Sequence, residues 1–199
     1  MPDWTEEAIC RARGARVIAG VDEVGRGPLA GPVTAAAVVL DPLNAQTGLD
    51  DSKKLSLKAR DVLFDQIIAS ARVSVAHASV EEIDDLNILY ASHLAMDRAV
   101  AGLGEVCHAL IDGNMIPKGL NCSATAVVKG DGRSLSIAAA SIIAKVTRDR
   151  IMVDLAQQYP GYGWERNAGY PTKVHREALE TLGVTPHHRR SFKTVHNML

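Results

Sequence analysis

The chain has 199 residues, of which 47% are hydrophobic, and its formal net charge at pH 7 is −1. This composition predicts one domain, or one domain with a small appendage, and enough apolar side chains for a buried core. No membrane span or export signal is expected, and three cysteines without metal-ligand spacing predict reduced thiols in a cytoplasmic protein.

The stretch from Val17 to Pro32 combines a short apolar run, the pair Asp22-Glu23 and a loop rich in glycine and proline. The run is too short for a helix, so it predicts a buried strand that ends in an acidic site. Neighbouring carboxylates repel each other and need a cation, a basic partner or solvent. For this pair taken alone, a β-turn with solvated acids is the alternative.

The same loop matches the dinucleotide-binding pattern G-x-G-x-x-A from Gly25 to Ala30. That pattern requires a helix that starts in the loop and crosses to a parallel strand. Here the next apolar run, residues 33–40, starts at once, and Pro28 and Pro32 disfavour a helix. We therefore exclude a nucleotide cofactor and expect two neighbouring antiparallel strands.

Residues 48–101 are predicted to form a loop, a helix, a strand and two helical segments. The polar loop 48–55 carries Lys53 and Lys54, which are either phosphate contacts or ordinary surface lysines. Ser56 is placed to cap a helix, residues 72–80 alternate as a third strand, and residues 81–101 predict a short helical turn and a longer helix.

Two further strands are predicted to stop beside an acid. Residues 107–111 lead to Asp112, and residues 123–128 lead through a turn to Asp131. If these strands are parallel and linked by right-handed helical crossovers, their carboxyl ends share one edge of the sheet. Asp22, Glu23, Asp112 and Asp131 would then converge, which predicts a shared metal site.

A long helix is predicted from Ser134 to Gln158, apolar over most of its circumference. Its polar stripe, Ser141, Lys145 and Arg148, is expected to emerge near the edge of the sheet, either as a phosphate contact or as a solvated stripe. Glycine and proline then interrupt the chain, and residues 159–199 predict a small helical appendage.

Charge is distributed unevenly along the chain. Residues 1–112 carry 10 basic and 17 acidic side chains, whereas residues 113–199 carry 12 and 6. The basic part ends in the segment 187–192 and holds most of the aromatic residues, namely Tyr159, Tyr162, Trp164, Tyr170 and Phe192. This part is either a face that lies against a sugar-phosphate backbone or a solvated face.

Seven blocks, in this order, resemble the bacterial ribonuclease HII family from about Val17 nearly to the end of the chain. They are Asp22-Glu23-Val24-Gly25-Arg26-Gly27, Asp51-Ser52-Lys53-Lys54-Leu55, Asp112-Gly113-Asn114, Lys129-Gly130-Asp131, Ala139 to Val146, Gly169-Tyr170-Pro171-Thr172 and His188-Arg189-Arg190-Ser191-Phe192.

The resemblance implies a ribonuclease H-like α/β fold with a mixed five-stranded sheet flanked by helices. The catalytic domain would span residues 1–158, with residues 1–16 outside the family signature, and residues 159–199 would form a small C-terminal helical substrate-binding region. The implied activity is cleavage of RNA in RNA–DNA hybrids and at ribonucleotides embedded in duplex DNA.

The resemblance also carries over site residues. It makes Asp22, Glu23, Asp112 and Asp131 the catalytic set that binds Mn²⁺ or Mg²⁺. It makes the loop Gly25-Arg26-Gly27 the reader of the ribose 2′-hydroxyl and Tyr170 the residue that packs on the nucleotide at the scissile bond. Phosphate contacts are implied less directly for Lys53, Lys54, Ser141 and Lys145.

The expected partners are hybrid and ribonucleotide-containing duplexes, bound by a monomer that associates with no membrane. The chain ends at Leu199 without the glutamine-led tail of some relatives, so recruitment to a sliding clamp is in doubt. Two other classes stay open. A DNA-specific nuclease would share the acids but would not need a 2′-hydroxyl reader, and a non-catalytic hybrid-binding module would tolerate loss of the acids.

Overall fold

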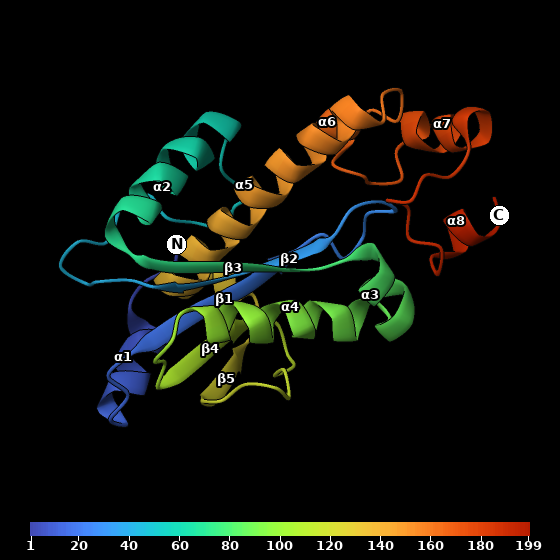
Figure 1. The fold of residues 1–199 in the computed structure, drawn as a ribbon. Helices are drawn as coiled ribbons and strands as arrows, with labels where there is room; N and C mark the ends of the chain where they lie inside the picture. Colours follow the sequence, from blue (N-terminus) through green and yellow to red (C-terminus); the bar gives the residue numbers. More distant parts are fainter.

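Five strands form one mixed sheet in the computed structural model, which describes residues 1–199 (Figure 1). The spatial order is β3-β2-β1-β4-β5. β1 runs antiparallel to β2 and parallel to β4, and β4 runs parallel to β5. The strands are β1 Ile18–Val24, β2 Val33–Val39, β3 Arg72–Ala78, β4 His108–Asp112 and β5 Ser123–Val127.

Helices cover both faces of this sheet (Figure 1). α5 and α2 pack on one face and α4 on the other, while α6, α7 and α8 gather at one end beside the connection between β1 and β2. The helices are α1 Thr5–Ala12, α2 Leu57–Ser70, α3 Val80–Leu86, α4 Ile88–Gly102, α5 Leu135–Gln158, α6 Trp164–Asn167, α7 Lys173–Leu182 and α8 Lys193–His196, with a 3-10 turn, η1, at Gly130–Gly132.

The sequence explains where the elements begin and which sides they bury. Ser56, Ser134 and Thr172 each accept a hydrogen bond from the backbone N–H three residues further on, so α2, α5 and α7 start at side-chain caps. Successive side chains of β2 enter opposite cores, with Ala35 packed on the α4 side and Ala36 on the α5 side. The predicted mixed five-stranded sheet is confirmed.

The expected helical crossover between the last two parallel strands is wrong. Residues 113–122 connect β4 to β5 without any helix. The strands lie side by side and are only five residues long each, so an irregular loop spans the return.

α5 approaches β1 so closely that a glycine is required between them. A Cβ at Gly20 would lie 2.0 Å from the backbone carbon of Ser136, at the start of α5. The same region is fixed from outside by α1, because the buried carboxylate of Glu7 accepts hydrogen bonds from the hydroxyls of Ser134 and Ser136. These contacts set the position of η1, which carries Asp131.

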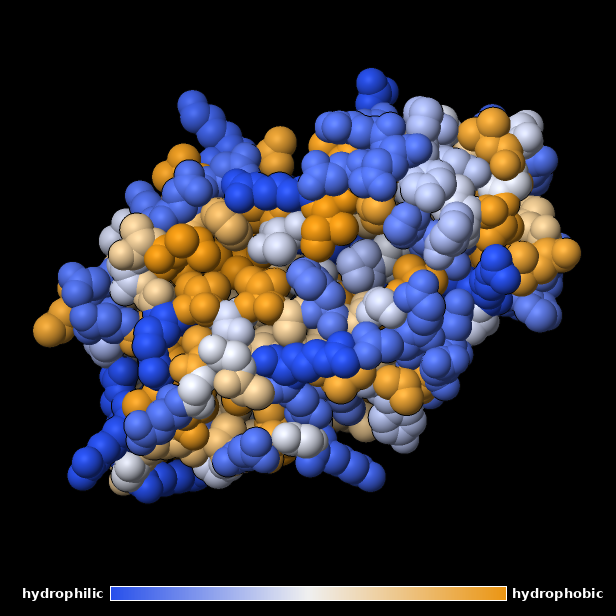
Figure 2. Space-filling model, viewed as in Figure 1, coloured by the Kyte–Doolittle hydropathy of each residue, from blue (hydrophilic) through white to orange (hydrophobic).

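The surface mixes both kinds of side chain. In Figure 2 hydrophobic residues form separate patches between hydrophilic ones, which is usual because much of a folded protein's surface is apolar. No helix is both long and apolar enough to cross a membrane. The three cysteines form no disulfide.

Candidate active site

Four carboxylates meet at one edge of the sheet. Asp22 and Glu23 lie in the last three residues of β1, and Asp112 is the last residue of β4. The parallel register pairs Val21 with Ile111, so Asp22 and Asp112 occupy the same level of adjacent strands. Asp131 follows β5 in η1, and the N–H of neighbouring Gly130 donates to Asp112 Oδ1 at 2.7 Å. The predicted convergence of strand ends is present.

The strand continues further than the sequence indicated. β1 remains paired with β2 through Val24, so Asp22 and Glu23 are strand residues that leave on opposite faces and not residues of a curled loop. Asp22 is 8% exposed, and its Oδ1 accepts the N–H of Glu23 at 2.7 Å. Glu23 instead forms an ion pair with Arg26, with Nη1 at 3.3 Å from Oε1.

Burial and mutual repulsion dominate the electrostatics of this edge. Burial, then the charges of Glu23 and Asp112, raise the pKa of Asp22 well above its usual range. Burial also raises the pKa of Glu23, against the opposing effect of Arg26, and burial with the charge of Asp112 raises the pKa of Asp131. Each ionised carboxylate therefore makes the next one harder to ionise.

This donor set fits a hard divalent cation. All four groups are carboxylates, the ligands that Mg²⁺ and Mn²⁺ prefer, and Asp22 has no basic partner despite its burial. The side chains do not close a ready-made cage of three or more ligands. A bound cation would offset the burial and the repulsion that raise the pKa of Asp22, so the chemistry of this edge is compatible with a metal.

The glycine loop and Tyr170 lie next to each other beside the acids. A Cβ placed on Gly27 would lie 3.3 Å from Cε1 of Tyr170. The Tyr170 side chain comes from the segment between α6 and α7 and is 40% exposed. Gly25 has φ of +98°, a conformation that L side chains rarely adopt. Gly27 and Tyr170, which are 143 positions apart in the sequence (170 − 27), thus form one surface.

The lysine loop borders the acidic edge from the other side. Partial burial opposes the charge of Lys53, but the carboxylates of Asp51, Asp22, Asp131 and Asp112 raise its pKa, which places its ammonium group in their field. Lys54 forms an ion pair with Asp50 at 3.1 Å. Lys53 therefore interacts with three of the four acids, whereas Lys54 interacts with Asp131 alone among them.

The remaining predicted contacts differ in exposure. Lys145 forms an ion pair with Asp149 at 2.8 Å and keeps 22% of its side chain exposed. Ser141 is 4% exposed, donates its hydroxyl hydrogen to the carbonyl of Ala138 and accepts the N–H of Ser52. Its hydroxyl thus supports the lysine loop from inside the protein.

Comparison with known proteins now identifies the chain. The family model described as Ribonuclease HII matches residues 19–195. The chain belongs to the ribonuclease HII family. A ribonuclease HII of Ruegeria pomeroyi is 70% identical over 199 residues, which cover 100% of this chain and 85% of that protein.

Solved structures agree on the fold. The crystal structure of ribonuclease H2 from Pyrococcus horikoshii matches with a TM-score of 0.77 and 30% identity, covering 92% of this chain and 97% of that one. A ribonuclease HII from Archaeoglobus fulgidus, solved in complex with PCNA, matches with a TM-score of 0.78 and 28% identity over 89% and 96% of the two chains. The predicted ribonuclease H-like fold is therefore confirmed.

Ribonuclease HII proteins are metal-dependent endoribonucleases, so this chain is a hydrolase with ribonuclease H activity, the cleavage of RNA in RNA–DNA hybrids. The family assignment confirms the expected enzyme class.

Two expectations about the basic part of this ribonuclease HII are wrong. Arg148 and Arg189 are fully buried, whereas the sequence placed them on a polar stripe and in a basic segment facing a nucleic acid. Trp164 and Tyr162, also expected to face a backbone, are 1% and 4% exposed and pack in the core of the C-terminal region. The type of a charged or aromatic residue does not show which groups will surround it in the fold. Here loop carbonyls surround the two arginines, and other rings surround the two aromatic residues.

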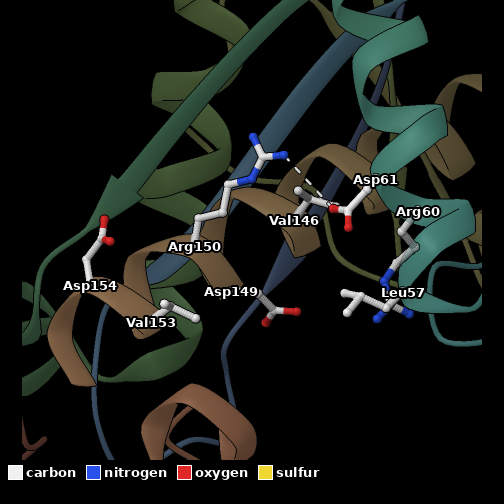
Figure 3. A pocket seen from close by; sticks show the side chains of 8 residues that line it. All are labelled: Leu57, Arg60, Asp61, Val146, Asp149, Arg150, Val153 and Asp154. Atoms are coloured by element: carbon white, nitrogen blue, oxygen red, sulfur yellow. Dashed lines mark ion pairs between the residues drawn. The ribbon is translucent and has the colours of Figure 1, made fainter. Parts of the chain in front are cut away.

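The hollow between α2 and α5 is not this active site. It has a volume of about 350 Å³ and contains none of the four acids (Figure 3). Arg150 and Asp61 face each other across it at 4.0 Å. Arg60, on its wall, donates to the carbonyls of Ser52 and Leu55, so this region supports the lysine loop from behind.

Proposed function

We propose that this ribonuclease HII cleaves the RNA strand of RNA–DNA hybrids and also cuts at single ribonucleotides embedded in duplex DNA, by two-metal-ion catalysis. The observation that carries the proposal is the position of the Gly27–Tyr170 contact beside the four converging carboxylates. A metal site supplies hydrolysis, and an adjacent small-residue loop supplies a place where a ribose can be examined at close range.

In this proposal Asp22, Glu23, Asp112 and Asp131 hold two Mg²⁺ or Mn²⁺ ions. When bound, these ions supply Lewis-acid activation of a water and neutralise charge at the leaving oxygen. Because water is the nucleophile, the products are a 5′-phosphate and a 3′-hydroxyl.

The other residues hold and orient the substrate. The loop Gly25 to Gly27 contacts the 2′-hydroxyl, and the exposed ring of Tyr170 packs on the nucleotide at the scissile bond. Lys53, within the field of the acids, contacts the phosphate next to them, with Lys54 and Lys145 as further phosphate contacts. Ser141 contributes by fixing the lysine loop.

The proposal extends to organisation and partners. Residues 1–158 form the catalytic domain, and residues 159–199 add Tyr170 and exposed bases as a substrate-binding region. All proposed contacts lie on one chain, so we propose a monomer that cleaves without a sliding clamp. We also propose that the protein is cytoplasmic. The solved PCNA complex concerns the archaeal relative.

The experiment is a panel of end-labelled duplexes incubated with the purified chain and either Mg²⁺ or Mn²⁺. The panel contains pure DNA, an RNA–DNA hybrid and DNA with one ribonucleotide. We expect cleavage of the second and third, and ligation assays on the products should show 5′-phosphate and 3′-hydroxyl ends. Cleavage of pure DNA at a comparable rate would contradict ribose recognition, and a 2′,3′-cyclic product would contradict water as the nucleophile.

A further inference from the structure

The side chain of Arg189 lies inside the β1–β2 connection and is 0% exposed. It forms no ion pair with a carboxylate. Instead its guanidinium group donates to backbone carbonyls of one loop, with Nη2 at 2.6 Å from the oxygen of Gly25 and Nη1 at 3.2 Å and 2.8 Å from those of Arg26 and Pro28. It also donates to the carbonyls of Gly31 and Pro32. One charged group therefore binds five carbonyls of this turn.

These contacts fix the direction of the remaining polar groups in the loop. In a trans peptide the carbonyl and the N–H point to opposite sides, and all peptide bonds of this chain are trans. The carbonyls of Gly25 and Arg26 point inward to Arg189. The N–H groups of the same two peptides, which belong to Arg26 and Gly27, therefore point away from it. Neither N–H donates a hydrogen bond within the protein.

The charge of Arg189 also strengthens these donors. Burial, and then the nearby charge of Arg148, lower the pKa of Arg189 to about 9, so the group remains protonated at pH 7. Hydrogen bonds in a chain polarise one another, and a carbonyl that accepts from a cation makes the N–H of its own peptide a better donor.

Arg189 is bound to the loop through its backbone N–H, which donates to the carbonyl of Leu29 at 2.8 Å, and contacts outside the loop also hold the segment that carries it. Asp84 accepts the backbone N–H groups of Arg190 and Ser191 at 3.0 Å and 2.9 Å, and the ring of Phe192 lies 5.2 Å from the guanidinium carbon. The C-terminal segment is thus anchored outside the loop immediately after Arg189, which supports the arginine as it holds a loop that is rich in glycine.

We propose that Arg189 is a positioning residue for ribose recognition: it draws the carbonyls of Gly25 and Arg26 inward, so that the N–H groups of Arg26 and Gly27 face the substrate as paired, polarised donors to the 2′-oxygen. This inference rests on the proposed cleavage at ribonucleotides. In this inference the 2′-hydroxyl is recognised as a hydrogen-bond acceptor. A buried residue that is not one of the four acids then controls the selectivity for ribose.

Arg148 provides a matched control. It is also 0% exposed and donates only to carbonyls, those of Ala30, Pro32 and Ala168. It packs against Gly25 but donates to neither of the two peptides that present the N–H groups. Lysine keeps the charge but has three donors on one atom and cannot reproduce the planar fork. Arg148→Lys and Arg189→Lys should therefore cost similar stability and differ in their effect on ribose recognition.

The test compares cleavage of duplexes that carry one ribonucleotide or one 2′-fluoro nucleotide, because fluorine is a much weaker acceptor than the hydroxyl oxygen. Melting temperature, kcat and KM are measured for wild type and both variants. We expect Arg189→Lys to lose at least about 10-fold in kcat on the ribonucleotide with KM changed less than about 3-fold, and its preference for ribose over 2′-fluoro to fall, since small errors of placement act mainly on the rate. Arg148→Lys should keep the wild-type preference.

The outcomes separate the inference from the function on which it rests. Loss of preference by both lysine variants, or by neither, would overturn the role of Arg189 alone. A wild-type protein that does not prefer ribose would overturn the proposed function and this inference together. If Arg189→Lys does not fold, Arg189→Ala is refolded with ethylguanidinium, and recovery of cleavage without ribose preference would also overturn the role.

Discussion

Substitutions at the two loop glycines should separate backbone recognition from folding. A Cβ at Gly27 would lie 3.3 Å and 3.8 Å from two ring carbons of Tyr170, slightly inside an ordinary carbon–carbon contact. The ring is 40% exposed and can recede by about 0.3 Å. If a misplacement of about 1 Å costs on the order of 100-fold in rate, Gly27→Ala should cost about 4-fold and the bulkier Gly27→Val on the order of 100-fold.

Gly25→Ala should behave differently because its site is closed. Its φ is +98° and its Cβ would lie 2.2 Å from Nε of buried Arg148. Positive φ alone costs about 1–2 kcal/mol, and displacing the guanidinium adds to this. For a chain of this length each kcal/mol lowers the melting temperature by about 2–4 °C, so we expect a loss of roughly 5–10 °C for Gly25→Ala and little for Gly27→Ala.

The assay is single-turnover cleavage of end-labelled DNA containing one ribonucleotide, with duplex affinity measured separately without divalent metal. Arg26→Lys serves as the control, because it keeps the positive charge opposite Glu23 and leaves the backbone of the loop unchanged. Wild-type cleavage by Gly27→Val would refute backbone reading of the ribose. So would a larger loss from Arg26→Lys than from Gly27→Val, which would make the arginine side chain the reader.

Three further outcomes are expected. Asp22→Asn and Asp112→Asn should each retain less than about a tenth of wild-type turnover at saturating Mg²⁺. Because the pKa of Asp22 is raised, its ionisation destabilises the metal-free fold as pH rises above about 4. Asp22→Asn should therefore melt at an equal or higher temperature than wild type at pH 7, and a lower melting temperature would contradict the raised pKa. Replacing the exposed Arg190 and Lys193 with alanine should make the salt dependence of duplex binding shallower. An unchanged salt dependence would mean that these side chains are solvated and do not contact the duplex. Burial lowers the pKa of His188 from 6.5 to about 4, so the unfolded chain takes up the proton first as pH falls. About 3 kcal/mol of stability should therefore be lost between pH 6.5 and pH 4. A wild-type melting temperature that stays constant over this range, or one that varies equally in His188→Asn, would refute the lowered pKa of His188.

The basis of that pH dependence is a buried chain of hydrogen bonds. His175 Nδ1 donates to the carbonyl of Tyr170 at 3.0 Å, so its Nε2 accepts from Trp164 and from His188 Nε2, each at 3.0 Å. His188 Nδ1 accepts the N–H of Thr185 at 2.9 Å. An extra proton on His188 Nδ1 would face that N–H and break the chain, and with it the support of the Tyr170 backbone.

The sequence alone determined the elements that local chemistry controls. Short apolar runs that stop at Asp22 and Asp112 indicated buried strands, and the side-chain cap Ser56 marked a helix start, because these signals depend on neighbours a few residues away. The convergence of the acids followed from the predicted strands once these strands were taken as parallel. The family assignment confirms the enzyme class that the resemblance to ribonuclease HII implied.

Only the tertiary structure decided what the buried arginines do. Arg189 reads as a surface base because its acceptors, the carbonyls of Gly25 to Pro32, lie more than 150 residues earlier in the chain and converge only when the β1–β2 connection folds over it. The same holds for Arg148 and for the hydroxyl of Ser141, whose partner Ser52 belongs to another loop. A guanidinium group can be buried when enough carbonyls surround it, and the number of carbonyls that meet at one point is a property of the folded chain and not of any local sequence.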